Sequence, residues 1–202
     1  MFDKIAYCIE RVRLQGTQAG TKIIKDLKGK EDYNLYELRP LDERIFMCLW
    51  NGNHFVMLSH YKKDANETDE LELARARRLR DKFFKESGIK ISTRRERDDL
   101  AMKTWDEMIK GMSQESIQEI EIIRKRAAMV VALIQLRESK GWTQAELARR
   151  AGMKQSAIAR FESDTTAPRI DTIIRVAMAL GVDLTLMPMD HSGHQQAAAL
   201  TV

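Results

Sequence analysis

The stretch TQAELARRAGMKQSAIARF, residues 143–161, predicts two short helices joined by a tight turn. Thr143 is expected to cap the first helix, and Glu146, three residues later, to complete a capping box. Gly152 can adopt the left-handed conformation that ends this helix without steric cost. The second helix is expected to bury Ile158 against the first. This spacing is typical of a helix-turn-helix, and an ordinary pair of amphipathic helices is the alternative.

The same stretch resembles the helix-turn-helix of the lambda-repressor/Cro-like (XRE) family, from about Val130 to Leu186 and including APRIDTIIRVAMALGV. The resemblance implies an all-α domain that binds double-stranded operator DNA as a homodimer, with the second helix of the motif in the major groove. The residues expected on the DNA are Gln144, Lys154, Gln155, Ser156, Ala159, Arg160, Thr165 and Arg169.

Three of these residues have distinct expected roles. Gln155 suits bidentate contact with adenine, and Arg160 suits guanine. Lys154 stands where the family prefers Ser, Thr or Asn as the helix cap. Because a cation is unfavourable at the positive end of a helix, we expect a DNA phosphate to offset its presence there.

Composition limits the class of protein. The chain has 202 residues, of which 44% are hydrophobic and 32% charged, which is typical of globular proteins. Its net charge of +4 is too small for binding through a general polycationic surface. We expect no membrane segment, no signal peptide, no cofactor and no metal, and a cytoplasmic location. Cys8 and Cys48 are expected to be buried free thiols.

The N-terminal half predicts a mixed domain. Thr17 to Lys30 is expected to be a loop, and Asn51-Gly52 between two apolar runs is a hairpin signal. One face of the last helix carries apolar residues, with Arg75, Arg77, Arg78 and Arg80 largely on the others. The expected elements are a helix over Phe2–Leu14, strands over Leu35–Arg39, Arg44–Trp50 and Phe55–Tyr61, and a helix over Glu70–Glu86.

This order resembles the HigB-like branch of the RelE/ParE toxin superfamily. The residues that carry the likeness are LYELR at Leu35–Arg39, Arg44-Ile45-Phe46, Tyr61–Lys63 and Glu72–Ala76. The resemblance implies an α+β fold that here lacks its first strand, leaving an open sheet edge. It also implies ribosome-dependent mRNA endoribonuclease activity. The candidate catalytic residues are Arg39, Arg44 and Lys63 for charge stabilisation and His60 or Tyr61 for proton transfer.

Departures from the family weaken the prediction of catalysis. Asp64 stands where a second lysine would fall, and Asp69 replaces the proline that usually precedes the last helix. Strand-edge salt bridges for the two arginines and simple packing for Tyr61 are the structural alternatives. Whether the chain is an enzyme is therefore left open, with a non-enzyme favoured.

From Met102 the sequence resembles the start of a HigA-type antitoxin, with an acidic, Trp-containing opening. We expect Ser113 or Ser116 to cap the next helix, Gly181 to end the last one, and Asp183–Met187 to form a strand. The predicted units are a toxin-like domain (1–88), a linker (89–101), an antitoxin N-terminal segment (102–129), the helix-turn-helix domain (130–190) and a tail (191–202).

Three functions fit this organisation. The favoured one is a HigA-like, sequence-specific DNA-binding regulator fused to a HigB-like toxin module, with repression of its own promoter. The second is a ribonuclease restrained by its own C-terminal half, with the ribosome and mRNA as partners. The third is a regulator whose toxin-like remnant only mediates assembly, with toxin–antitoxin contacts within or between chains.

Overall fold

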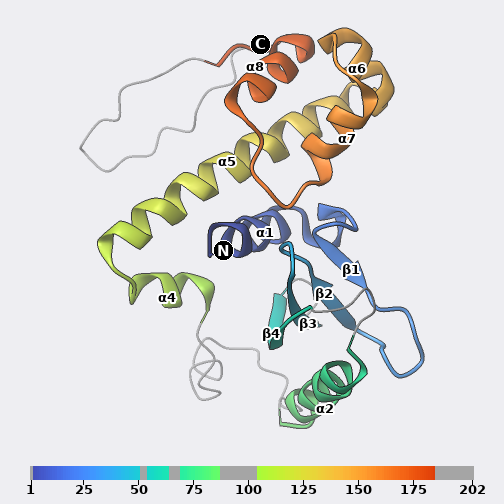
Figure 1. The fold of residues 1–202 in the computed structure, drawn as a ribbon, viewed down its shortest axis with the longest axis vertical. Coiled ribbons are helices and arrows are strands. Elements are labelled where there is room, and N and C mark those ends of the chain that lie inside the picture. Colours follow the sequence, from blue (N-terminus) through green and yellow to red (C-terminus); the bar gives the residue numbers. More distant parts are fainter. Residues whose placement is uncertain (1, 51–53, 64–68, 87–103, 185–202) are drawn as a thin grey trace.

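A computed structural model describes residues 2–50, 54–63, 69–86 and 104–184. Its elements are α1 (Phe2–Gln15), the 3-10 helix η1 (Gly16–Ala19), β1 (Ile24–Asp26), β2 (Leu35–Leu38), β3 (Glu43–Trp50), β4 (His54–Lys62), α2 (Glu70–Glu86), α4 (Trp105–Lys110), α5 (Gln114–Ser139), α6 (Gln144–Ala151), α7 (Gln155–Ser163) and α8 (Ile170–Leu180) (Figure 1).

The N-terminal domain contains a four-stranded antiparallel sheet in the order β1-β2-β3-β4. The α+β prediction and the hairpin pairing of β3 with β4 are confirmed, although the turn at Asn51-Gly52 lies outside the described residues. The prediction of a loop over Thr17–Lys30 was wrong for six of its residues, because Thr17 to Ala19 belong to η1 and Ile24 to Asp26 pair with β2. β1 therefore covers the edge of β2 with backbone hydrogen bonds, as an exposed strand edge requires.

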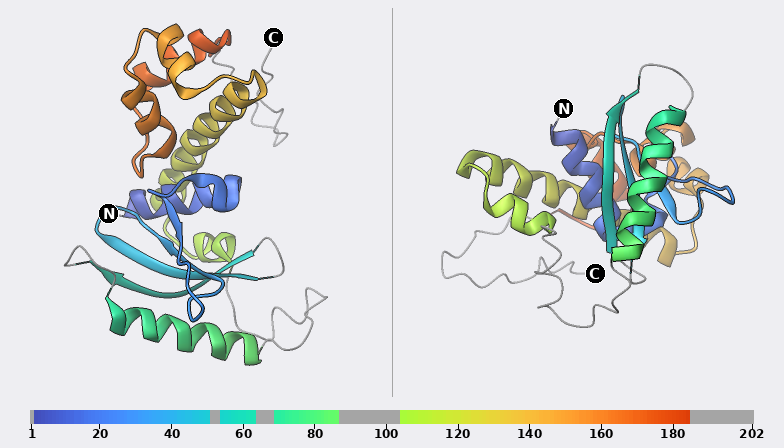
Figure 2. Two further views of the ribbon diagram at one scale, coloured as in Figure 1. Left: turned by 90° about the vertical axis from the view of Figure 1, so that its right-hand side faces the viewer. Right: turned by 90° about the horizontal axis from the view of Figure 1, so that it is seen from below.

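The layers of the molecule are α2, the sheet, α1 and the C-terminal helices, in that order (Figure 2). One face of the sheet packs against α2 through Leu35, Phe46 and Leu73. The other face packs against α1 through residues such as Ile9 and Met47. Each sheet face is therefore covered by one helix.

Helix α1 is enclosed on two sides. Beyond the sheet it packs against α5, where Ala6 and Tyr7 contact Ile123 and Ala127. Seven consecutive residues of α1, from Ala6 to Val12, are therefore buried. This is wider than one apolar stripe, because a helix covered on both sides buries most of its circumference.

Polar contacts add to this packing between α1 and the C-terminal helices. The buried carboxylate of Glu10 accepts hydrogen bonds from Trp105 Nε1 at 2.8 Å and Arg124 Nε at 3.0 Å. Asp106 forms ion pairs with Arg13 and Arg124. The N-terminal domain therefore docks within the chain onto α4 and α5.

Helix α2 differs from its prediction at one arginine. Arg80 was expected on a polar face, yet it is buried. Its guanidinium stacks 4.0 Å from the Tyr33 ring and donates to the backbone oxygens of Glu31 and Tyr33. The loop before β2 supplies these acceptors, which the helical pattern alone cannot reveal.

The C-terminal half contains α4 to α8. Ser113 caps α5 as expected, and α5 then runs unbroken across position 130 into the helix-turn-helix. Gly181 ends α8 in the left-handed conformation, with φ 79°. Of the expected strand over Asp183–Met187, the structure describes Asp183 and Leu184, which belong to no strand. None of the helices in the described ranges is long and apolar enough to cross a membrane.

Candidate nucleic-acid interface and the sheet cluster

The two helices of the predicted motif, α6 and α7, are oriented by a local turn. The Thr143 side chain accepts a hydrogen bond from the Glu146 backbone N–H at 3.1 Å, which caps α6. Gly152 ends α6 with φ 62° and ψ 35°. Leu147 and Ile158 are buried in one core with α5 and α8. The predicted helix-turn-helix is confirmed.

Glu146 has a different role from the one expected in a capping box. Its carboxylate accepts hydrogen bonds from Arg149 and Arg150. These three bonds lower the pKa of Glu146 to about 2. The guanidinium of Arg150 also lies 4.0 Å from the Trp142 ring, so the exposed face of α6 is tied together by local contacts.

The first turns of α7 form an exposed rim. Lys154, Gln155, Ser156 and Arg160 are exposed and Ala159 is partly buried. The Arg160 side chain is 74% exposed and only loosely paired with Asp164, at 3.9 Å. Within the described part of the chain, Lys154 makes no side-chain cap hydrogen bond on α7. These side chains are free to contact a ligand; Arg169, also exposed, lies just before α8.

Two other predicted DNA contacts are placed differently. Thr165 is buried, with 7% of its surface exposed, so its side chain lies below the rim. Gln144 is partly buried and accepts a hydrogen bond from Gln155 Nε2 at 3.3 Å. Its own Nε2 donates to Glu162 at 2.9 Å. The Gln144 side chain therefore links the Gln155 side chain to the Glu162 carboxylate.

Glu162 is a buried residue that the motif analysis missed. Its carboxylate binds Arg137 Nε at 2.6 Å and Nη2 at 3.0 Å, as well as Gln144. The missed signal was spacing, because Glu162 follows the buried Ile158 by four positions and therefore lies on the same face of α7. Glu162 links α5, α6 and α7.

A second cluster lies on the face of the sheet covered by α2. Arg39 Nε and Arg44 Nε lie 3.3 and 3.5 Å from the carboxylate of Glu37, which is buried. Among the described residues, neither Nε atom has a hydrogen-bond partner, so both contacts are ion pairs without hydrogen-bond alignment. Tyr61 donates its hydroxyl to the same carboxylate at 3.4 Å. We call Glu37, Arg39, Arg44 and Tyr61 the sheet cluster.

The environment of the sheet cluster affects its proton chemistry. Burial, and then the negative charge of Glu37, raise the pKa of the Tyr61 hydroxyl. Arg44 Nη1 donates to the backbone oxygens of Leu41 and Glu43. A hydroxyl with a raised pKa is a poorer proton donor and remains neutral near pH 7. Glu37 was missed by the sequence analysis, although it shares the two-residue period of Leu35 and Arg39 in LYELR.

Of the other two predicted catalytic residues, His60 lies apart from Glu37. His60 is paired across the sheet with Ile45, one position from the Arg44–Tyr61 pair, so its side chain lies on the opposite face. There its Nε2 lies 2.6 Å from the Glu43 carboxylate. The Lys63 backbone N–H donates to Asp42. The structure thus brings three of the five candidates together.

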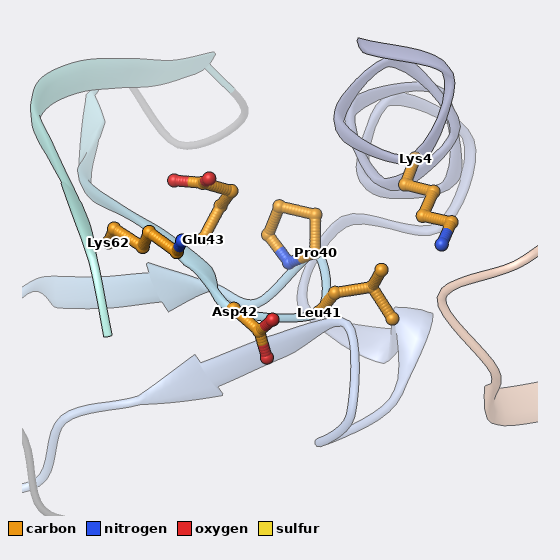
Figure 3. A pocket seen from close by; sticks show the side chains of 6 residues that line it. All are labelled: Lys4, Pro40, Leu41, Asp42, Glu43 and Lys62. Atoms are coloured by element: carbon orange, nitrogen blue, oxygen red, sulfur yellow. The ribbon is translucent and has the colours of Figure 1, made fainter. Parts of the chain in front are cut away.

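Figure 3 shows a pocket of about 220 Å³ on the His60 side of the sheet. Its lining residues are Lys4, Pro40, Leu41, Asp42, Glu43 and Lys62. Of the described residues, none of the five predicted catalytic side chains lines it. Two lysines face two carboxylates there, so the pocket carries no excess of either charge and does not favour an anionic substrate.

Two family models match separate parts of the chain. The model described as phage derived protein Gp49-like matches residues 2–81, and the helix-turn-helix model matches residues 133–187. The first covers the sheet with its two helices, and the second covers the core that carries the exposed rim. No solved structure matches this chain.

Three curated relatives are similar to part of the chain. An uncharacterized HTH-type transcriptional regulator of Haemophilus influenzae is 32% identical over 85 residues, which cover 42% of this chain and 85% of the relative. Antitoxin HipB of Escherichia coli K12 is 35% identical over 51 residues, covering 25% and 58%, respectively. Antitoxin HipB of E. coli O6:H1 is 31% identical over 62 residues, covering 31% and 66%. The antitoxins among them are named HipB rather than HigA.

The fold and the exposed rim define a DNA-binding protein with a second domain fused in front of it. The chain belongs to the helix-turn-helix transcriptional regulators, with an XRE-type domain that follows a Gp49-like domain of the RelE/HigB toxin class. The predicted fusion of a toxin-family domain with a DNA-binding regulator is confirmed.

Proposed function

We propose that this chain binds a twofold operator as a homodimer in the cytoplasm and represses its own promoter. The observation that supports this most is the exposed rim of α7, where Gln155, Ser156 and Arg160 face outward from a capped, fully packed motif. One motif contacts only a few base pairs, so two copies on half-sites about one helical turn apart are needed for specificity.

The rim residues have separate roles in this proposal. Gln155 contacts adenine and Arg160 guanine, while Lys154 and Arg169 contact phosphates. Gln144 orients Gln155 through its amide oxygen. Thr165 takes no part, because its side chain is buried.

A binding experiment tests this proposal. The full chain is titrated against labelled DNA from upstream of its own gene and against a scrambled duplex at the same salt concentration. We expect a preference for the upstream DNA and complexes with two chains per duplex. Equal affinity for both duplexes would refute sequence-specific operator binding, and one chain per duplex would refute the dimer.

We also propose that the toxin-like domain (1–88) is the toxin partner of the rest of the chain and docks in cis, with the linker at 89–101 and the antitoxin segment at 102–129. The support is the buried contact of α1 with α5, including the Glu10–Arg124 ion pair at 3.0 Å. A tethered partner has a millimolar effective concentration when the linker spans the two sites. The docked state is therefore the resting state of the chain.

Ribonuclease activity of the N-terminal domain is the second candidate function. The observation that favours it is the sheet cluster, where two arginines and a tyrosine hydroxyl meet. Glu37 opposes it, since this carboxylate already neutralises one of the two positive charges. On this reading Lys63 would add charge stabilisation at the end of β4, and ribosome-bound mRNA would be the substrate.

An undocked variant separates the two candidates. Ala127 is fully buried against α1, so Ala127→Glu places a charge in the contact and separates the domains. Growth arrest on expression of this variant, relieved by a second change, Tyr61→Phe, which removes only the candidate hydroxyl, would support the ribonuclease. Normal growth with intact RNA would refute it and leave DNA binding as the function.

A further inference from the structure

Arg11 connects the N-terminal domain to the recognition helix α7. It is the largest fully buried side chain of the described residues, with 0% exposure. Its Nη2 donates to the backbone oxygen of Glu162 at 2.6 Å. Nη1 donates to Tyr7 Oη at 3.2 Å and Nε to Gln15 Oε1 at 2.9 Å. All three of these acceptors are neutral.

A buried guanidinium bonded to neutral acceptors is unusual, because burying a charge is unfavourable unless an opposite charge lies close by. The Glu162 oxygen belongs to the last turn of α7, which ends at Ser163. Helix C-termini expose unbonded carbonyls and carry a partial negative charge. Arg11 therefore occupies a site where that partial charge stabilises it.

The contact supplies an end cap that α7 otherwise takes only from itself. Ser163 Oγ bonds to Ala159 O and the Asp164 N–H to Arg160 O, but both donors are local. At the other end of α7, Lys154 makes no side-chain cap bond in the described structure. Among the residues that the structure describes, Arg11 thus gives α7 a hydrogen bond from the N-terminal domain, and this bond reaches Glu162, whose carboxylate also binds Gln144.

Glu162 carries the connection onward. Its carboxylate accepts a hydrogen bond from Gln144, and Gln144 accepts one from Gln155, the first residue of α7. Arg137 fixes the same carboxylate from α5. A shift of the Glu162 backbone would thus change the position of the side chain expected to read the DNA.

We propose that Arg11 is a positioning residue for DNA recognition, through which docking of the toxin-like domain sets the geometry of α7. The inference rests on the proposed operator binding. Coupling of this kind is reciprocal, so bound operator DNA must strengthen the docking of α1 by the same factor. The regulator and its toxin-like domain then act as one unit on the promoter.

Three substitutions in α1, two at Arg11 and one control, test the proposal in the full chain. Arg11→Met removes the charge and keeps the length of the side chain, and we expect operator affinity to fall about tenfold. Arg11→Lys retains the positive charge and one donor nitrogen. We expect its operator affinity to lie between those of Arg11→Met and the wild type. Lys4→Met is the matched control, because Lys4 lies on the same helix but faces the pocket lined by Pro40 to Glu43. It should bind DNA like the wild type.

Hydrogen exchange supplies a second readout. In the wild type, operator DNA is expected to slow amide exchange in residues 6–12 of α1, and a scrambled duplex should not. This measurement needs no variant, so it decides the matter even if Arg11→Met does not fold.

The outcomes distinguish the two proposals. A wild type that does not bind the operator would overturn both the proposed operator binding and the role of Arg11. A wild type that binds, with equal affinities for Arg11→Met and the wild type, or with Lys4→Met as weak as Arg11→Met, would overturn the role of Arg11 alone. Unchanged exchange in α1 on operator binding would do the same.

Discussion

The sheet cluster and the α7 rim both gather arginine with uncharged hydrogen-bonding side chains, yet they differ in what surrounds the cations. In the sheet cluster, the Arg39 and Arg44 side chains are 29% and 9% exposed and share the carboxylate of Glu37. On the rim, Arg160 is mostly exposed and its nearest carboxylate lies 3.9 Å away. The same residue type stabilises the fold in one region and remains available for a ligand in the other.

The difference follows from desolvation. An arginine that is paired with a buried carboxylate must keep it, since removing either partner leaves an uncompensated charge. An exposed arginine retains its hydration and exchanges counterions for phosphates when DNA arrives. Substitutions should therefore affect folding in the sheet cluster and binding on the rim.

The largest expected effect is the loss of Glu37. Glu37→Ala leaves two arginines and the Tyr61 hydroxyl without their shared acceptor, and we expect a loss of about 3–5 kcal/mol of unfolding free energy. Urea denaturation of the full chain measures it. Glu119→Ala, which removes an exposed carboxylate of α5, is the control and should change little. Equal midpoints for the two variants would show that the sheet cluster is not structural.

Arg160→Ala should weaken DNA binding without changing the stability of the fold. We expect operator binding to weaken by about 1–3 kcal/mol, because a bidentate base contact is lost. The urea midpoint should not move, since the side chain is exposed. Fluorescence anisotropy measures the affinity, and Arg78→Ala, an exposed arginine of α2, is the control. If Arg78→Ala weakened binding as much, the rim would not be the specific surface.

Lys154→Ser tests the expected phosphate contact at the start of α7. Serine can cap the helix and should stabilise the chain by about 1 kcal/mol. Loss of one phosphate contact should reduce the slope of log affinity against log salt by about 1. Affinity measured at several salt concentrations reports the slope. An unchanged slope would mean that Lys154 does not contact DNA.

The smallest expected effect is on stability and concerns Cys8, which lies on α1 near Arg11. Burial raises the pKa of its thiol from the ordinary value of 9.0 to about 12. The folded state therefore holds the proton more tightly, so this stabilisation is present below pH 9 and is lost as the pH rises toward 12.

Comparison with Cys8→Ala isolates this contribution. Relative to the variant, the wild type should lose about 1 kcal/mol of stability between pH 8 and pH 10. Denaturation curves at the two pH values measure the difference. If the two proteins lost the same amount, Cys8 would titrate normally in the folded chain.

The parts of the molecule that the sequence predicted well are those determined by neighbours along the chain. Thr143 and Gly152 act within one turn of their helix, so the motif and most of its rim could be predicted. Helix α8 shows the limit. Ile174 and Met178 are as apolar as its buried residues, yet they are exposed, whereas Ile173, Val176 and Leu180 are buried. An apolar helix has several apolar faces that could be buried, and the face that is buried depends on the elements packed against the helix.

Long-range contacts account for the rest. Arg11 and Glu162 are separated by 151 positions, and no local pattern predicts that either would be buried. The strand β1 consists of only three residues and exists because β2 pairs with it. Charged residues are ordinarily assigned to the surface, so a single sequence gives no sign of those that tertiary structure encloses.

Helix α5 has a further consequence, because it continues without a break from its contact with α1 into the helix-turn-helix core. Its 26 residues form a rod of ~39 Å that fixes the rotation of one domain relative to the other. One residue inserted between Ala127 and Val130 would turn the DNA-binding domain by ~100° about this axis and separate Arg11 from α7. Seven inserted residues, about two full turns, would nearly restore the angle while moving the domains apart. The length of this helix, counted in turns, thus determines whether the two domains can meet at all.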